Sequence, residues 1–344
     1  MLYIIIIFLL VSVYLYCLLG GADFGAGIVE LFSKGENKKR ISSSITGAMA
    51  PIWEANHMWL IITIVILFNA FPTIYSRISI SLYIPLILLL LGIVFRGCAF
   101  TFRHYDAVKE PKTQAVYSRI FAYSSFFVTF FFGTNIGAIA SGKIHAAPSG
   151  FPEGYIFPWF NIFSISIGLF LCALFSSLAA VFLIGDADPN DKELKALFKL
   201  KSKQANIATV VTGGLVFIAS FIEQVNFAES FFTNTASMIF IVLATVSLPL
   251  LWQAINKELK WRSRIIAGAQ LLFILGAFYS VYFPTIVHLG DADDLTLFNS
   301  HAPDATLDYL GWALIIGSFI IFPSLYYLYK IFKIDERNEK AGAE

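Results

Sequence analysis

The stretch LYIIIIFLLVSVYLYCLL occupies residues 2–19 and contains no charged side chain. A run of about 18 apolar residues is long enough to cross the hydrocarbon core of a bilayer as a helix. Runs of this kind recur along all 344 residues, in a chain with 58% hydrophobic and only 14% charged residues. This composition excludes a soluble globular core and predicts an all-α polytopic membrane protein.

The apolar runs predict about nine transmembrane helices. Their expected ranges are 2–32, 45–70, 78–102, 115–141, 157–184, 205–225, 235–254, 263–285 and 307–332. Several ranges exceed the length that a perpendicular crossing needs, so we expect tilt or extension beyond the lipid. The first run has no charged leading segment and no small-residue cleavage site, and we interpret it as a retained helix.

The count suggests two four-helix bundles and one additional helix. We expect a first bundle with the charged residues in 1–141, a second bundle in 142–285, and a final helix with a cytoplasmic tail in 286–344. Nearly all of the 24 lysines and arginines fall on one side of these spans, whereas Arg77 and Lys143 fall on the other. The positive-inside rule therefore predicts an outside N-terminus and a cytoplasmic C-terminus.

Two features of the composition narrow the range of partners and cofactors. The formal net charge of +1 offers no basic footprint for nucleic acid, so no nucleic-acid partner is expected. Cys17, Cys98 and Cys172 lie far apart in apolar segments, without the spacing of a disulfide or metal motif. We interpret them as small buried hydrophobic residues and predict no metal site.

Three ionisable residues within the apolar runs are candidates for function, because a charge at membrane depth costs several kcal/mol unless it is paired, protonated or hydrated. At about 1.5 Å per residue from the basic side, Asp23 and Glu54 lie about 13 Å deep and Arg96 about 9 Å deep. Spans that are neighbours in sequence thus carry two acids and one base at similar depth. The group is either a packing ion pair or a site where the unneutralised acid exchanges protons.

Three further residues extend this cluster. Glu30 lies seven residues after Asp23 on the same helical face. It is either a wet interfacial residue or the entrance of a proton line through Asp23 to Glu54. His57 either forms hydrogen bonds within the Glu54 cluster or ligates a haem, and the other histidines lie in or near loops, which favours the first interpretation. Trp53 either packs or lines the edge of a cofactor.

Three segments resemble subunit II of cytochrome bd quinol oxidases. They are GGADFGAG at residues 20–27, WEANHMWLI at 53–61, and the pair Phe95-Arg96. The length, the nine predicted spans and the outside N-terminus also fit, so the resemblance covers the whole chain. The WEANH part is the most specific piece. In the first segment, Gly21 and Gly25 have the small-xxx-small spacing that lets helices approach closely.

The resemblance implies a heterodimeric enzyme of the bacterial inner membrane that oxidises a membrane quinol and reduces dioxygen to water without pumping protons. It implies that a partner, subunit I, ligates haem b and haem d-type groups, while this chain borders membrane lipid. In some members a structural quinone is bound to subunit II, and small single-span subunits attach to the complex.

The resemblance also assigns roles to residues. Glu54 matches a carboxylate on a cytoplasmic proton path that reaches the haems at the subunit interface, Asp23 and Arg96 belong to the same polar cluster, and Trp53 lies towards the haems. Many members carry an acid three residues before the position of Asp23, where this chain has Gly20, so a path that depends on that acid does not transfer. Two alternatives are a proton-coupled secondary transporter and a purely structural partner of a haem subunit.

Overall fold

The computed structural model describes residues 1–49, 53–108, 110–188 and 190–331. Within these residues nine helical segments are long and apolar enough to cross a membrane, as the apolar runs predicted. The first, Leu2–Leu31, comprises α1 (Leu2–Leu15), the π-helix η1 (Tyr16–Gly20) and α2 (Gly21–Leu31). The others are α4 (Trp53–Ala70), α6 (Tyr83–Tyr105), α7 (Pro111–Ala140), α9 (Ile162–Asp186), α10 (Lys192–Ile222), α12 (Thr235–Asn256), α13 (Lys260–Tyr282) and α14 (Asp304–Tyr329).

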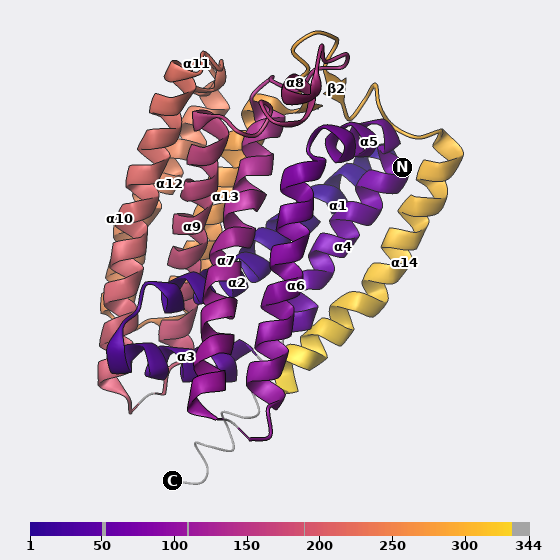
Figure 1. Ribbon diagram of the computed structural model, residues 1–344. Coiled ribbons are helices and arrows are strands. Elements are labelled where there is room, and N and C mark those ends of the chain that lie inside the picture. The colour runs from indigo at the N-terminus through magenta and orange to yellow at the C-terminus, as the bar shows by residue number, and fades with distance from the viewer. Residues whose placement is uncertain (50–52, 109, 189, 332–344) are drawn as a thin grey trace.

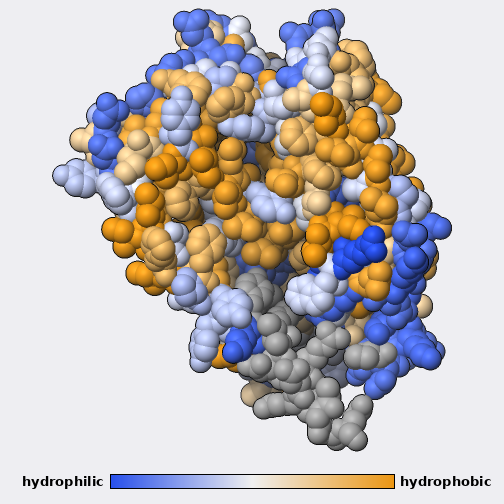
Figure 2. All heavy atoms as spheres, turned by 180° about the vertical axis from the view of Figure 1, so that it is seen from behind, coloured by the Kyte–Doolittle hydropathy of each residue, from blue (hydrophilic) through white to orange (hydrophobic). Residues whose placement is uncertain are grey.

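Shorter elements close the two ends of the helical assembly (Figure 1). One end holds α3 (Gly35–Met49), and the other holds α5 (Pro72–Ser81), α8 (Phe151–Tyr155), α11 (Phe227–Thr233) and the antiparallel strands β1 (Thr285–Val287) and β2 (Leu295–Thr296). We call the first the basic end, because α3, the last turn of α6 and the first turns of α7, α10 and α13 all carry lysine or arginine. The second, which includes the N-terminus, is the strand end. Hydrophobic side chains cover the middle of the face shown in Figure 2.

The membrane helices pack around α9, which contacts α2, α7, α10 and α13. Further pairs are α6 with α7, α12 with α13, and α1 with α4, while α14 lies against α1 and α4. The predicted division into 1–141, 142–285 and 286–344 stays a prediction. Direct packing of α2 and α7 on α9 gives the two proposed bundles a shared interface.

Glycines of α2 set the closest approach in this interface. A Cβ atom at Gly25 would lie 1.9 Å from the carbonyl oxygen of Phe175 on α9, and one at Gly21 would lie 2.7 Å from the Phe175 ring. Any larger residue at these positions would force the two helices apart. The small-residue spacing of the sequence therefore brings α2 against α9.

The second span is shorter than predicted. The expected range 45–70 is wrong at its beginning, because α3 ends at Met49 and α4 begins at Trp53, with residues 50–52 outside the described part of the chain. The α3 sequence GENKKRISSSITGAM is too polar for lipid, and this helix lies at the basic end. Glu54 lies in the first turn of α4.

Candidate functional site

Two buried ion pairs connect the first and third membrane spans. Arg96 on α6 places Nη2 2.9 Å from Oδ2 of Asp23 on α2, and Arg103 places Nη1 3.0 Å from Oε2 of Glu30. Both acids are closed off from the surface, with side chains 0% exposed. The acids are seven residues apart on α2, as are the arginines on α6. Because seven residues advance a helix by about 10.5 Å, the pairs form two layers at different depths.

Serines of α7 complete both layers. Nε of Arg96 donates a hydrogen bond to Oγ of Ser125 at 3.0 Å, and the hydroxyl of Ser118 donates to Oε1 of Glu30. These serines are also seven residues apart, so three neighbouring helices repeat the same spacing. We call the two groups the Asp23 layer, with Arg96 and Ser125, and the Glu30 layer, with Arg103 and Ser118.

Phe121 lies on α7 between the two serines and is fully buried. Its ring centroid is 4.8 Å from Cζ of Arg96 and 4.4 Å from Cζ of Arg103. A cation within about 6 Å of an aromatic ring is attracted to the ring face. One apolar ring therefore contacts both guanidinium groups and separates the two layers.

The Asp23 carboxylate has charged neighbours but no hydrogen bond. Its Oδ2 lies 2.9 Å from Arg96 and 3.3 Å from Nε2 of His57, yet neither carboxylate oxygen accepts a hydrogen bond from a described residue. The reason is geometric, because Nη2 of Arg96 donates to the backbone oxygen of Asp23 at 3.1 Å. A buried acceptor in this state costs about 1–3 kcal/mol.

The imidazole of His57 is held by aromatic rings. Its centroid lies 5.3 Å from that of Phe24 and 6.2 Å from those of Tyr16 and Trp53. Nε2 faces Asp23, and Nδ1 is buried without a hydrogen-bond partner among the described residues. One imidazole nitrogen thus faces an acid, as the interpretation of His57 as a member of the polar cluster expects, and its role stays a prediction. In the described part of the chain no group of three or more potential ligand side chains could hold a metal ion.

Glu54 stands apart from the Asp23 layer. Its side chain is exposed and forms neither a hydrogen bond nor an ion pair with any described residue. It shares a helical face with Ile61, Val65 and Phe68, which lie 7, 11 and 14 residues further along α4 and are 62%, 42% and 58% exposed. The structure therefore joins Asp23 to Arg96, as expected, and leaves Glu54 on an apolar surface.

Arg103 is a site residue that the sequence pattern did not single out. Its position suggests a basic loop residue, but α6 continues to Tyr105 and Arg103 is 6% exposed. Glu30, its partner, is 0% exposed and so is not a wet interfacial residue. The seven-residue spacing from Arg96 to Arg103, which matches that from Asp23 to Glu30, is the signal that could have revealed the second pair.

A π-helical segment positions the first span in this site. η1 covers Tyr16–Gly20 and directly precedes the turn that carries Asp23. π-helical turns are rare and occur frequently at functional sites. Tyr16, the first residue of η1, contacts both Phe24 and His57. The wider turn also rotates α2 relative to α1, so the face of Asp23 does not follow from α-helical periodicity.

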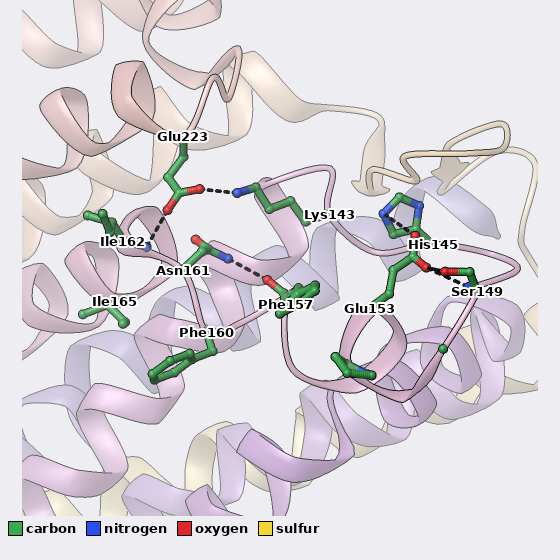
Figure 3. A pocket seen from close by; sticks show the side chains of 12 residues that line it. Lys143, His145, Ser149, Glu153, Phe157, Phe160, Asn161, Ile162, Ile165 and Glu223 are labelled. Atoms are coloured by element: carbon green, nitrogen blue, oxygen red, sulfur yellow. Dashed lines mark hydrogen bonds and ion pairs between the residues drawn. The ribbon is translucent and has the colours of Figure 1, made fainter.

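A pocket lies at the strand end, apart from the residues of these two layers. It has a volume of about 900 Å³ and is lined by residues of α8, the start of α9 and the segment around Lys143 (Figure 3). Its polar groups satisfy one another: Glu223 accepts from Lys143 and from the backbone N–H of Ile162, and Asn161 caps α9. The hydrogen bond from Lys143 lowers the pKa of Glu223 from its usual value. The pocket is thus a closed set of contacts, in contrast to the unsatisfied Asp23 carboxylate.

Comparisons with known proteins agree with one another. The family model for cytochrome bd terminal oxidase subunit II matches residues 1–332. The chain is 24% identical over 335 residues to cytochrome bd ubiquinol oxidase subunit 2 of Bacillus subtilis (strain 168), covering 95% of this chain and 94% of that protein. It is 25% identical over 181 residues to cytochrome bd-I ubiquinol oxidase subunit 2 of Escherichia coli (strain K12), covering 51% and 46%.

The fold is similar to that of a chain of the bd oxidase from Geobacillus thermodenitrificans, with a TM-score of 0.75 at 19% sequence identity over 96% of this chain and 99% of that one. A family match over nearly the whole length, together with the nine membrane helices of the described residues, settles the assignment. The chain belongs to the family of cytochrome bd terminal oxidase subunit II and is a membrane subunit of a bacterial quinol oxidase.

Proposed function

We propose that this chain forms a heterodimer with a haem-bearing subunit I and conducts protons from the cytoplasm towards the site of dioxygen reduction, without pumping. The observation that carries the proposal is the position of Glu54. It is an acid exposed on an apolar helix face, one helical turn from His57, which in turn contacts the buried Asp23. Family membership supports quinol oxidation as the source of electrons.

Subunit I would pack on the face of α4 that carries Glu54. An acid that faces lipid at membrane depth is costly, whereas the same acid against a polar group of a partner is not. Ile61, Val65 and Phe68 continue this face, and Leu90 and Val94 of α6 are likewise exposed, at 58% and 51%. The face therefore offers apolar packing with one ionisable group.

The basic end would face the cytoplasm, by the positive-inside rule. The Glu30 layer then lies nearest the cytoplasm and the Asp23 layer deeper in the membrane. Protons for water would enter at this end, while protons from quinol would leave at the strand end. Such an arrangement builds a membrane potential although no proton is carried across the whole membrane.

Each charged residue has a separate role in this proposal. Arginine stays protonated in proteins, so Arg96 and Arg103 hold Asp23 and Glu30 in place and do not transfer protons themselves. The haem b and haem d-type groups, when bound in subunit I, supply electron transfer and dioxygen chemistry. The residues of this chain hold and move protons, and Trp53, whose ring centroid lies 6.2 Å from that of His57, would border the haem side of the path.

The remaining partners follow from the family and from the surface. Membrane lipid would cover the exposed apolar residues of α10 and α12, such as Val211 and Ile239, which are both 56% exposed. Quinol would be oxidised in subunit I. A structural quinone and small single-span subunits stay expectations from the resemblance, and we assign them no residues.

The test is Glu54→Gln in the complete oxidase. We expect a red complex with a second polytopic subunit and a normal reduced-minus-oxidised spectrum, but quinol-driven oxygen consumption reduced about 100-fold, the loss typical of a missing proton-transfer group. Glu36→Gln, which changes an exposed acid of α3, is the matched control and should retain full activity. Wild-type turnover in a spectrally normal Glu54→Gln complex would remove Glu54 from the proton path.

A further inference from the structure

The proposed proton path needs a group that connects Asp23 with Glu54, because the two acids do not contact each other. The side chain of Asp23 is 0% exposed, whereas Glu54 is exposed on the surface of α4. Among the described residues no hydrogen bond or ion pair joins them. His57 is related to both acids: its Nε2 lies 3.3 Å from Oδ2 of Asp23, and its position on α4 is one turn after Glu54.

We propose that His57 transfers protons between Asp23 and Glu54. This inference rests on the proposed proton path and names the residue that connects its buried and exposed parts. Residues three apart on a helix have Cβ atoms about 5–6 Å apart, which lets a glutamate side chain reach a neighbouring imidazole. His57 is 17% exposed at its side chain, intermediate between its two partners.

Unsatisfied polar atoms mark the route. Both carboxylate oxygens of Asp23 and Nδ1 of His57 are buried without a hydrogen-bond partner among the described residues. Buried polar groups in native proteins nearly always have a partner, and the exceptions call for an explanation. Atoms that donate and accept a mobile proton in turn form a hydrogen bond only while the proton passes, which would account for the unsatisfied atoms of these two facing side chains.

The transfer conserves protons at each atom. Neutral His57 with its proton on Nδ1 accepts a proton at Nε2 from the protonated carboxyl of Asp23, which becomes a carboxylate beside Arg96. The imidazolium then releases the Nδ1 proton to the carboxylate of Glu54. One proton has moved from Asp23 to Glu54, and His57 now carries its proton on Nε2. A tautomeric exchange restores the starting state.

Other groups that face His57 do not offer this chemistry. Arg96 of α6 reaches the site through Asp23 and keeps its charge. Tyr16 of η1, Phe24 of α2 and Trp53 of α4 present rings that fix the imidazole. Histidine is the side-chain type that gains and loses a proton between about pH 5 and 8. Within this group His57 is therefore the residue suited to transfer.

The test is His57→Gln in the complete oxidase, with rates expressed per haem. Glutamine keeps a polar side chain but does not carry a proton between two acids. We expect oxygen consumption to fall about 100-fold and its dependence on pH between about 5.5 and 8 to flatten, while the haem spectrum is unchanged. His104→Gln, an exposed histidine of α6, is the matched control and should match the wild type in rate and pH profile.

A second variant distinguishes transfer from packing. His57→Glu restores a group that titrates, so part of the rate should return, with a pH profile displaced to lower pH. A wild-type rate in His57→Gln, or a slower rate with an unchanged pH profile, would overturn the role of His57. If Glu54→Gln is slow while His57→Gln is normal, the path stands without His57. If the Glu54→Gln complex consumes oxygen at the wild-type rate, the proposed proton path through Glu54 is itself refuted, whatever the result for His57.

Discussion

Replacing Arg96 by leucine tests whether the Asp23 layer holds the first and third spans together. Arg96 is 2% exposed and contacts the Asp23 carboxylate at 2.9 Å, its backbone oxygen at 3.1 Å and Ser125 at 3.0 Å. Its Cζ also lies 4.9 Å from the ring centroid of Phe24. Leucine removes every one of these polar contacts and leaves the acid enclosed.

The cost follows from the partner that remains. Removing one member of a buried ion pair typically destabilises by about 3–5 kcal/mol, because the other charge stays in a medium of low polarity. Lost cation–π contacts to Phe24 and Phe121 add about 1 kcal/mol. A total of about 5 kcal/mol is comparable with the whole stability of many domains. For a chain of this size we expect the thermal midpoint to fall by about 10 °C and the haem content of the complex to drop.

A double variant separates the stranded charge from lost packing. Arg96→Leu combined with Asp23→Asn leaves no charge in the layer, so we expect most of the stability to return, since neutral replacement of both partners is often tolerated. Thermal unfolding of the purified complex and the haem content per protein measure the effect. A single variant as stable as the wild type, or a double variant no more stable than the single one, would refute the ion-pair argument.

Two further perturbations test the packing and the strand end. Gly25→Ala should destabilise by about 1–3 kcal/mol because its Cβ would meet the Phe175 carbonyl at 1.9 Å, whereas Gly214→Ala, with nothing within 4 Å, should be neutral or stabilising when both are compared by thermal unfolding. Glu223 has a pKa lowered below 4.5 in the folded chain, chiefly by Lys143. The contribution of ionised Glu223 to the free energy of unfolding is therefore fully present above about pH 4.5, and it is lost as the pH falls through the lowered pKa. The wild type should melt above Glu223→Gln at pH 6, and this difference should vanish at low pH.

The membrane spans could be predicted from sequence because length and hydropathy decide them locally. The same holds for the partnership of Asp23 with Arg96, since charges in apolar runs of neighbouring spans have few alternatives for neutralisation. Close packing of α2 also followed from Gly21 and Gly25, although the identity of the neighbour, α9, required the structure.

The orientation of each side chain around its helix could not be predicted in this way. Counting residues from the ends of the spans predicted that Glu54 and Asp23 lie at similar depth. Such a count contains no information on which face of α4 carries Glu54. The π-helix η1 changes the register of the residues after it. The ion pair of Arg103 with Glu30 could not be predicted, because an arginine near the end of a span is also typical of the positive-inside pattern. The proposed contact of Glu54 with subunit I likewise involves a second chain, which the sequence of one chain does not describe.

The Glu30 and Asp23 layers show why similar spacing does not by itself make a path. A line of acids from Glu30 through Asp23 to Glu54 would need polar groups at each step, yet the ring of Phe121 contacts both guanidinium groups between the first two. An aromatic ring neither donates nor accepts a transferable proton, and attraction from two cations holds it in place. In the proposed mechanism a proton can therefore leave the Glu30 layer for Asp23 only when the Phe121 ring moves aside, or by a route that passes beside the ring. Nε2 of His57 and Oδ2 of Asp23, in contrast, lie 3.3 Å apart, so in the proposed mechanism a reorientation of these two side chains is enough to bring them into a hydrogen bond.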